Sequence, residues 1–219
     1  MHIPIHREGW PFIGFAAVAN LLAYLLTPWA GLVLLPVTLW VVAFFRDPER
    51  TAPSGPGLVI CPADGKLLPV VQAVPPAELD MGADPVTRLS IFMNVFNVHV
   101  NRSPCDGTVT KLAYRPGKFF NASFDKASTD NERMSMRLRV TGAGGVAEKD
   151  IAVVQIAGLV ARRIVSETSE GQQLCRGARF GIIRFGSRVD VYLPGAVRVT
   201  AKSGQTVRAG ETILASYQS

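Results

Sequence analysis

The chain has 219 residues, a formal net charge of +6 and 48% hydrophobic side chains. This length allows one full-sized domain with an attached segment and leaves little room for two large domains. A basic protein often binds nucleic acid, but this chain has no dense run of lysine and arginine and no aromatic-rich RNA motif. We therefore expect no nucleic-acid partner.

Residues 1–45 are predicted to form a hydrophobic membrane anchor. Residues 11–45 contain no charged side chain, and Thr27-Pro28 interrupts the run. One membrane span needs about 20 apolar residues, so the run fits two short helices that turn at Thr27-Pro28 and either cross the bilayer or dip into it. The run is too long for a cleaved signal peptide and has no clear small-residue cleavage site.

The charges that flank the anchor predict its orientation. Arg7 precedes the apolar run and Arg46 follows it, and positive residues favour the cytoplasmic side of a membrane. We therefore expect the chain on the cytoplasmic face of the inner membrane. A basic domain held at that surface faces anionic phospholipid, which is the partner that the charge favours.

The rest of the chain is predicted to be a linker followed by one domain. Residues 46–57 are rich in Pro, Gly and charge, as linkers are. Residues 58–219 consist of short β-branched runs separated by Gly, Pro and Asp, which predicts a mainly β domain, sandwich-like or barrel-like, and an α+β chain overall. The segments CPADGKL (61–67) and SPCDGTV (103–109) share an Asp-Gly turn signal, which indicates two hairpin entries.

Histidine is scarce in the domain. His99 is the only histidine after the anchor, and strand alternation in VFNVHVNRSP (95–104) would place Asn97, His99 and Asn101 on one face. This polar row fits either a pocket or a solvated face. Asp64 and Ser187 would complete an Asp-His-Ser set, but the Gly-x-Ser-x-Gly elbow of many hydrolases is absent. No metal-ligand spacing is present, so we expect no metal.

Five segments, taken together and in this order, resemble phosphatidylserine decarboxylases of the short prokaryotic form. They are CPADGKL, FMNVFNVHVNRSPCDG, GKFFNASFDKASTDNER, VQIAGLVARRIV and RFGSRVDVYLP. The resemblance covers nearly all of the chain after the linker, and an N-terminal hydrophobic anchor is compatible with it.

The resemblance implies a pyruvoyl enzyme that makes its own cofactor by self-cleavage. The cleaved bond corresponds to Gly186-Ser187, which would give a β chain of residues 1–186 and an α chain of residues 187–219 headed by a pyruvoyl group derived from Ser187. Many relatives have Leu-Gly-Ser-Thr here, whereas this chain has Phe-Gly-Ser-Arg. The pyruvoyl ketone would form a Schiff base with phosphatidylserine, and loss of CO2 would give phosphatidylethanolamine.

The resemblance also assigns roles to individual residues. His99 corresponds to the base that activates Ser187, and Asp64 would hold the imidazole in the right tautomer. Asn97, Arg162 and Arg163 are weaker candidates for substrate binding, and the two arginines fit a solvated charge pair equally well. The sequence leaves open whether identical chains assemble into a homo-oligomer.

Two other function classes remain open from the residues alone. The tail, residues 194–216, resembles a lipoyl-like carrier or adaptor module, although Lys202 lacks the flanking methionines of a modified lysine. Alternatively, Ser187 would act as the standing nucleophile of a Ser-His-Asp lipid hydrolase. A membrane-attached β domain without activity is the third alternative.

Overall fold

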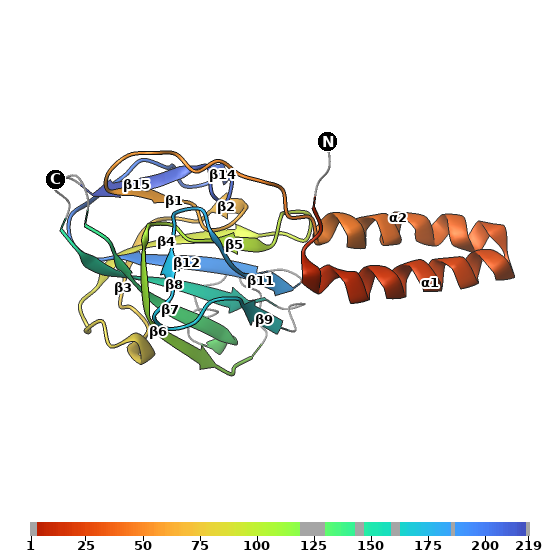
Figure 1. Cartoon of the computed structure of the whole chain (residues 1–219), viewed down its shortest axis with the longest axis horizontal. Helices are drawn as coiled ribbons and strands as arrows, with labels where there is room; N and C mark the ends of the chain where they lie inside the picture. The colour runs from red at the N-terminus through yellow and green to blue at the C-terminus, as the bar shows by residue number, and fades with distance from the viewer. Residues whose placement is uncertain (1–3, 119–129, 143–146, 159–162, 185–186, 218–219) are drawn as a thin grey trace.

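The computed structural model describes residues 4–118, 130–142, 147–158, 163–184 and 187–217. A pair of antiparallel helices projects from one end of a mainly β domain (Figure 1). The predicted α+β class is therefore confirmed. The described strands form open antiparallel sheets and no closed barrel.

The helix pair turns at the predicted residues. A short 3-10 helix, η1 (Arg7–Gly9), leads into α1 (Trp10–Leu26), and α2 (Pro28–Phe44) follows directly. Thr27 between them is extended, at φ −158° and ψ 128°, because the residue before a proline avoids the helical region. The segment Arg7–Leu26, with 20 residues, is long and apolar enough to cross a membrane, and Pro28–Phe44 is a shorter apolar helix.

The strands of the domain have the following bounds. They are β1 (Leu58–Ile60), β2 (Gly65–Leu67), β3 (Val71–Ala73), β4 (Val86–Met93), β5 (Val100–Arg102), β6 (Gly107–Arg115), β7 (Arg133–Val140), β8 (Lys149–Ala157), β9 (Arg163–Ser166), β10 (Gln173–Leu174), β11 (Arg179–Arg184), β12 (Ser187–Leu193), β13 (Val197–Val199), β14 (Thr206–Val207) and β15 (Ile213–Tyr217), and a 3-10 helix η2 (Ala77–Leu79) lies between β3 and β4.

Nine of these strands form the main sheet, in the order β10-β6-β7-β8-β12-β4-β2-β14, with β3 paired to β4. Two smaller sheets have the orders β1-β15-β13 and β5-β11-β9. Within the main sheet β12 lies between β8 and β4, and all its residues are buried. Its apolar side chains Val189 and Val191 belong to the main core, whereas Tyr192 joins a second cluster. Because side chains alternate along a strand, both faces of β12 are covered.

Both Asp-Gly turns begin a strand, as predicted. Gly65 opens β2 and Gly107 opens β6. A Cβ atom on Gly65 would lie 2.1 Å from the carbonyl oxygen of Phe92, and one on Gly107 would lie 2.4 Å from that of Arg139. Each glycine is therefore required by the close approach of a neighbouring backbone. The aspartates differ, because Asp64 is buried and Asp106 is exposed.

The predicted linker, residues 46–57, has no helix or strand but contacts the domain along its length. Asp47 forms ion pairs with Arg102 and Arg179, at 3.2 and 2.6 Å. Further along, the carbonyl oxygen of Gly55 accepts a hydrogen bond from Arg176. This segment holds the base of the helix pair against the domain.

The strand predicted over residues 95–101 is wrong in its first half. β4 ends at Met93, a turn follows, and extended structure resumes at β5. The turn is closed by the backbone N–H of Asn97, which donates to the carbonyl oxygen of Asn94 at 3.0 Å, and by the side-chain oxygen of Asn97, which accepts from the N–H of Asn94 at 2.9 Å. Asparagine side chains compete for backbone groups in this way and favour turns over strands.

Candidate active site

His99 lies at the base of the helix pair and is completely buried. Its Nδ1 is 3.0 Å from the carbonyl oxygen of Asn97. A carbonyl can only accept, so Nδ1 carries the proton and Nε2 has a free lone pair. Among the described residues Nε2 has no hydrogen-bond partner. Burial lowers the pKa of His99 to about 4, so the imidazole is neutral and its Nε2 can accept a proton.

The end of α2 holds the segment that carries His99. The ring of Phe44, the last residue of α2, stacks on the imidazole with centroids 4.2 Å apart. The indole of Trp40 donates to the carbonyl oxygen of Val95 at 3.2 Å, and Arg46 donates to that of Phe96 at 2.7 Å. The apolar anchor is therefore part of the surroundings of the imidazole.

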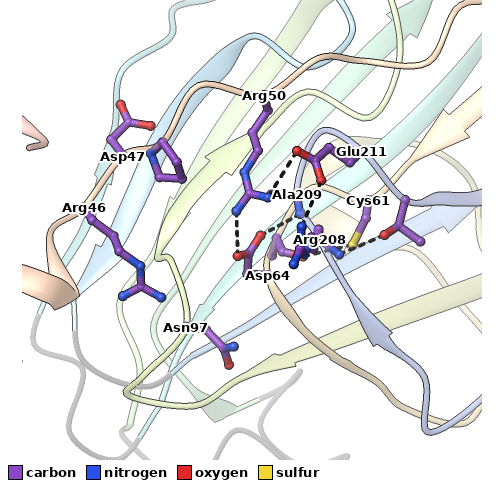
Figure 2. Close-up of polar contacts among 12 residues, drawn as sticks. Arg46, Asp47, Arg50, Cys61, Asp64, Asn97, Arg208, Ala209 and Glu211 are labelled. Atoms are coloured by element: carbon purple, nitrogen blue, oxygen red, sulfur yellow. Dashed lines mark hydrogen bonds and ion pairs between the residues drawn. The ribbon is translucent and has the colours of Figure 1, made fainter. Parts of the chain in front are cut away.

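Asp64 is buried in the first Asp-Gly turn and is held by two donors. The backbone N–H of Ala209 donates to its Oδ1 at 2.7 Å, and Arg50 donates to its Oδ2 at 3.0 Å. Arg50 also lies 3.3 Å from Glu211, so its guanidinium bridges two carboxylates (Figure 2). Burial raises the pKa of Asp64, and the Ala209 N–H and Arg50 act in the opposite direction.

Ser187 begins β12 and is fully buried, paired with Met93 on one side and Ala157 on the other. Its hydroxyl is 3.2 Å from the sulfur of Met93. Thioethers are weak acceptors, so the hydroxyl loses little hydrogen-bond energy when a base takes its proton. Met93 also ends β4 and so precedes the turn that leads to His99.

The structure does not join the predicted Asp-His-Ser set by direct hydrogen bonds. In the described part of the chain Asp64 contacts Arg50 and Ala209, His99 contacts the carbonyl of Asn97, and Ser187 contacts Met93. A backbone carbonyl thus fixes the tautomer of His99. The resemblance had implied this role for Asp64. Hydrogen bonds in a resting site are often longer than in the reacting complex, so these contacts leave the catalytic assignments as proposals.

The other predicted residues have different surroundings. Asn97 is half-buried and lies in the turn beside His99, whereas Arg163 is exposed at the start of β9. Gly186 and Arg162 lie outside the described residues. Within the described ranges, no three His, Cys, Asp or Glu side chains are grouped so as to hold a metal ion.

Three residues that contact the predicted site were not singled out from the sequence as site residues. Phe44 belongs to the apolar anchor, Arg50 to the charged linker and Met93 to an apolar strand. Each is an ordinary residue for its segment. Contacts between residues that are tens of positions apart in the sequence bring these side chains to the site, so no local sequence pattern could have identified them.

Comparison with known proteins defines the class to which this fold and site belong. The family model described as phosphatidylserine decarboxylase matches residues 37–215. The chain therefore belongs to the phosphatidylserine decarboxylase family, and it is a decarboxylase, an enzyme of the carboxy-lyase class.

One particular relative is similar over nearly the whole chain. It is the phosphatidylserine decarboxylase proenzyme of Paramagnetospirillum magneticum (strain ATCC 700264 / AMB-1), which is 56% identical over 219 residues that cover 99% of this chain and 88% of the relative. The resemblance found in the sequence is thereby confirmed.

Proposed function

We propose that the chain cuts itself between Gly186 and Ser187 and uses the resulting pyruvoyl group to convert phosphatidylserine into phosphatidylethanolamine. The observation that carries this proposal is the buried Nε2 of His99, a free lone pair on a neutral imidazole. The relative's name describes a proenzyme, which is a precursor form. A buried serine at the first position of a central strand is a suitable group to become a new, fixed chain terminus.

In the cleavage step Ser187 is the nucleophile and His99 is the base. As Nε2 takes the hydroxyl proton, Oγ bonds to the carbonyl carbon of Gly186 and the peptide C–N bond breaks, which leaves an ester and a free amine. Loss of the α-proton of Ser187 then breaks the ester C–O bond and releases residues 1–186 with a carboxyl terminus. Water adds to the dehydroalanine that remains, ammonia leaves, and the ketone of the pyruvoyl group is formed.

Asp64 has a proposed role as a second acid–base group. Burial raises the pKa of this carboxyl, which makes the carboxylate a stronger base than an exposed one. Its contacts with Ala209 and Arg50 hold it in one orientation. Arg50 thereby acts as a positioning residue.

During decarboxylation the pyruvoyl carbonyl supplies an electron sink for the charge left by the departing CO2. The chain itself supplies an apolar setting, since Phe44, Val98, Val100 and Ile182 belong to one buried cluster beside His99. Loss of CO2 disperses the localised charge of a carboxylate, so surroundings that solvate that charge poorly favour the step. His99 would hold and return the proton that replaces CO2.

The membrane location of the proposed substrate explains why the chain has a pair of apolar helices. Phosphatidylserine lies in a membrane, and α1 and α2 present exposed apolar side chains along their length. We propose that the helices insert at the cytoplasmic face of the inner membrane and hold the site at the headgroup level. The remaining partners are then the membrane itself and the β and α chains of one precursor.

Denaturing electrophoresis with intact-mass measurement tests the proposal. Purified wild-type protein should give two fragments, residues 1–186 and a smaller fragment whose blocked terminus reacts with a ketone reagent. Ser187→Ala should remain one chain and lose decarboxylation completely, because it lacks the nucleophile.

Ser90→Ala is the matched control. Ser90 is also a buried strand serine, on β4 next to β12, and its replacement should leave cleavage intact. An active wild-type preparation that consists of one full-length chain with an unmodified Ser187 would refute self-cleavage.

A further inference from the structure

Arg46 occupies the junction between the apolar helices and the site. It follows the C-cap of α2, Phe45, and pairs with Ile5 in an isolated bridge, so it lies at the base of both helices. Its side chain donates to the carbonyl oxygens of Ala43 and Phe96. Its guanidinium points into the same space as the carboxylate of Asp64 and the amide of Asn97 (Figure 2).

Arg46 differs from the other arginines around the base of the helices because its charge is not balanced by a close carboxylate. Arg50, Arg102, Arg179 and Arg184 each form an ion pair with Asp or Glu. Within the part of the chain that the structure describes, the hydrogen-bond partners of Arg46 are carbonyl oxygens alone and no carboxylate lies within ion-pair distance. Its side chain is half-buried, so water compensates its charge only in part.

Electrostatics around Arg46 favour an added anion. Burial lowers the pKa of Arg46, the charge of Asp64 acts in the opposite direction, and that of Arg50 adds to the lowering. The charge of Arg46 also acts on His99, whose pKa it lowers further. An anion beside the guanidinium would relieve the cost of burying this charge.

The lipid substrate carries two anionic groups, and the reaction itself distinguishes them. A cation bound to the reacting carboxylate would hold the negative charge on that group, whereas this charge must move into the electron sink as neutral CO2 leaves, so the cation would slow the step. A cation bound to the phosphodiester contributes to binding in the ground state and the transition state alike. Guanidinium also matches phosphate oxygens with two parallel hydrogen bonds.

We infer that Arg46 binds the phosphodiester of the lipid substrate and so sets the depth at which the headgroup enters the site. This inference rests on the proposed function for the identity of the substrate. It adds Arg46 to the sequence candidates for substrate binding, Arg162 and Arg163. The end of the membrane helix would then contribute directly to substrate recognition.

A split between KM and kcat tests this role. Full-length Arg46→Gln is compared with wild type on phosphatidylserine in mixed micelles, with KM expressed as a surface mole fraction. A charge-assisted contact of this kind contributes about a tenfold change in affinity or more, so KM should rise about tenfold. The kcat should change less than about threefold, self-cleavage should go to completion, and Arg46→Lys should recover part of the lost affinity.

Arg7→Gln is the matched control. Arg7 lies at the same end of the helix pair, is 73% exposed in its side chain and pairs with Glu167. Its loss removes one positive charge from the same surface without touching the site. An equal rise of KM in Arg7→Gln would mean a general attraction to anionic surfaces and would overturn the inference. An unchanged KM in Arg46→Gln would overturn it as well.

A binding measurement separates this inference from the proposed function. Dihexanoylphosphatidylglycerol has the phosphodiester but no serine, and calorimetric titration with it requires no turnover. Wild type should bind it about tenfold more tightly than Arg46→Gln, even if the chain proves to be uncut. Equal affinities would refute the role of Arg46, whereas an uncut wild type would refute only self-cleavage.

Discussion

At the scale of single residues, the site depends on keeping one imidazole away from water. His99 is completely buried and its ring lies against that of Phe44. Burial lowers its pKa to about 4, although the carbonyl of Asn97 acts in the opposite direction. A base functions in its unprotonated form, so His99 remains available well below the pH at which an exposed histidine would be protonated.

The pH dependence of self-cleavage should reflect this burial. Between pH 8 and pH 5.5 the wild-type rate should change less than about twofold, because the fraction of neutral His99 barely changes above a pKa of about 4. Phe44→Ala would admit water and move the pKa of His99 up toward its ordinary value of about 6.5, so the rate should fall about tenfold over the same range. Freshly synthesised chain, shifted to each pH and sampled on denaturing gels, gives the rates.

Phe44→Leu is the control for this measurement, since it keeps an apolar side chain over the imidazole. It should retain the flat profile of the wild type. A Phe44→Ala profile that stays flat while the rate drops uniformly would show that Phe44 only shapes the fold. In that case the contact of the rings would not control the pKa of His99.

At the scale of elements, the turn after β4 connects the site to the membrane helix. Its carbonyl groups at Val95 and Phe96 accept hydrogen bonds from Trp40 and Arg46. Phe96 is nevertheless 70% exposed. An aromatic ring beside the end of an apolar helix is suited to the interface between lipid headgroups and acyl chains. We therefore expect Phe96 to insert beside the helix pair.

Phe96→Ser should weaken the binding of the protein to lipid vesicles. Partition of one aromatic ring into the interface contributes on the order of 1 kcal/mol, so the partition coefficient should fall several-fold in a sedimentation assay with phosphatidylethanolamine and phosphatidylglycerol vesicles. Tyr114→Ser is the control, because Tyr114 is 54% exposed but belongs to β6, which is separated from β12 by β7 and β8 in the main sheet. Equal losses in both variants would contradict the role of Phe96.

The sequence predicted elements better than it predicted contacts. The helix pair and its turn followed from an uncharged run broken by Thr27-Pro28, and the two Asp-Gly turns followed from local backbone chemistry. The strand over residues 95–101 was wrong because the side chain of Asn97 bonds to backbone in a turn, which the alternation of residues does not encode. The contact of Phe44 with His99 spans 55 residues and has no local pattern.

The catalytic set was predicted only in part for the same reason. A resemblance to known enzymes indicated Asp64, His99 and Ser187, but it carried no information on which atoms they contact here. The carbonyl of Asn97 beside Nδ1 and the guanidinium of Arg50 beside Asp64 are tertiary contacts. In particular, residue types do not indicate which backbone carbonyl a side chain will contact.

At the scale of the whole molecule, the proposed cleavage would fall directly before the strand at the centre of the main sheet. β12 pairs along its length with β4 and β8. The segments that follow it also pair with the first strands of the domain, β14 with β2 and β15 with β1. The residues on the two sides of the break are thus interleaved throughout the domain.

The two fragments should therefore remain together without any covalent link. In mild detergent they should elute as one species in a 1:1 ratio, and they should separate only when the sheet is unfolded. Gel filtration followed by denaturing electrophoresis of each fraction measures this. Release of the smaller fragment under non-denaturing conditions would contradict the central position of β12 in the mature protein.

Because β12 is central, the protein can reach this fold only as an uncut chain. A single chain can place β12 between its neighbours because the sequence that precedes it is covalently attached, so the search is intramolecular. After cleavage, two separate polypeptides would have to meet and insert a strand into the interior of a sheet, at a rate that depends on their concentration. A mature enzyme that unfolds in a membrane where its two fragments are dilute then does not refold, and only new synthesis can replace it.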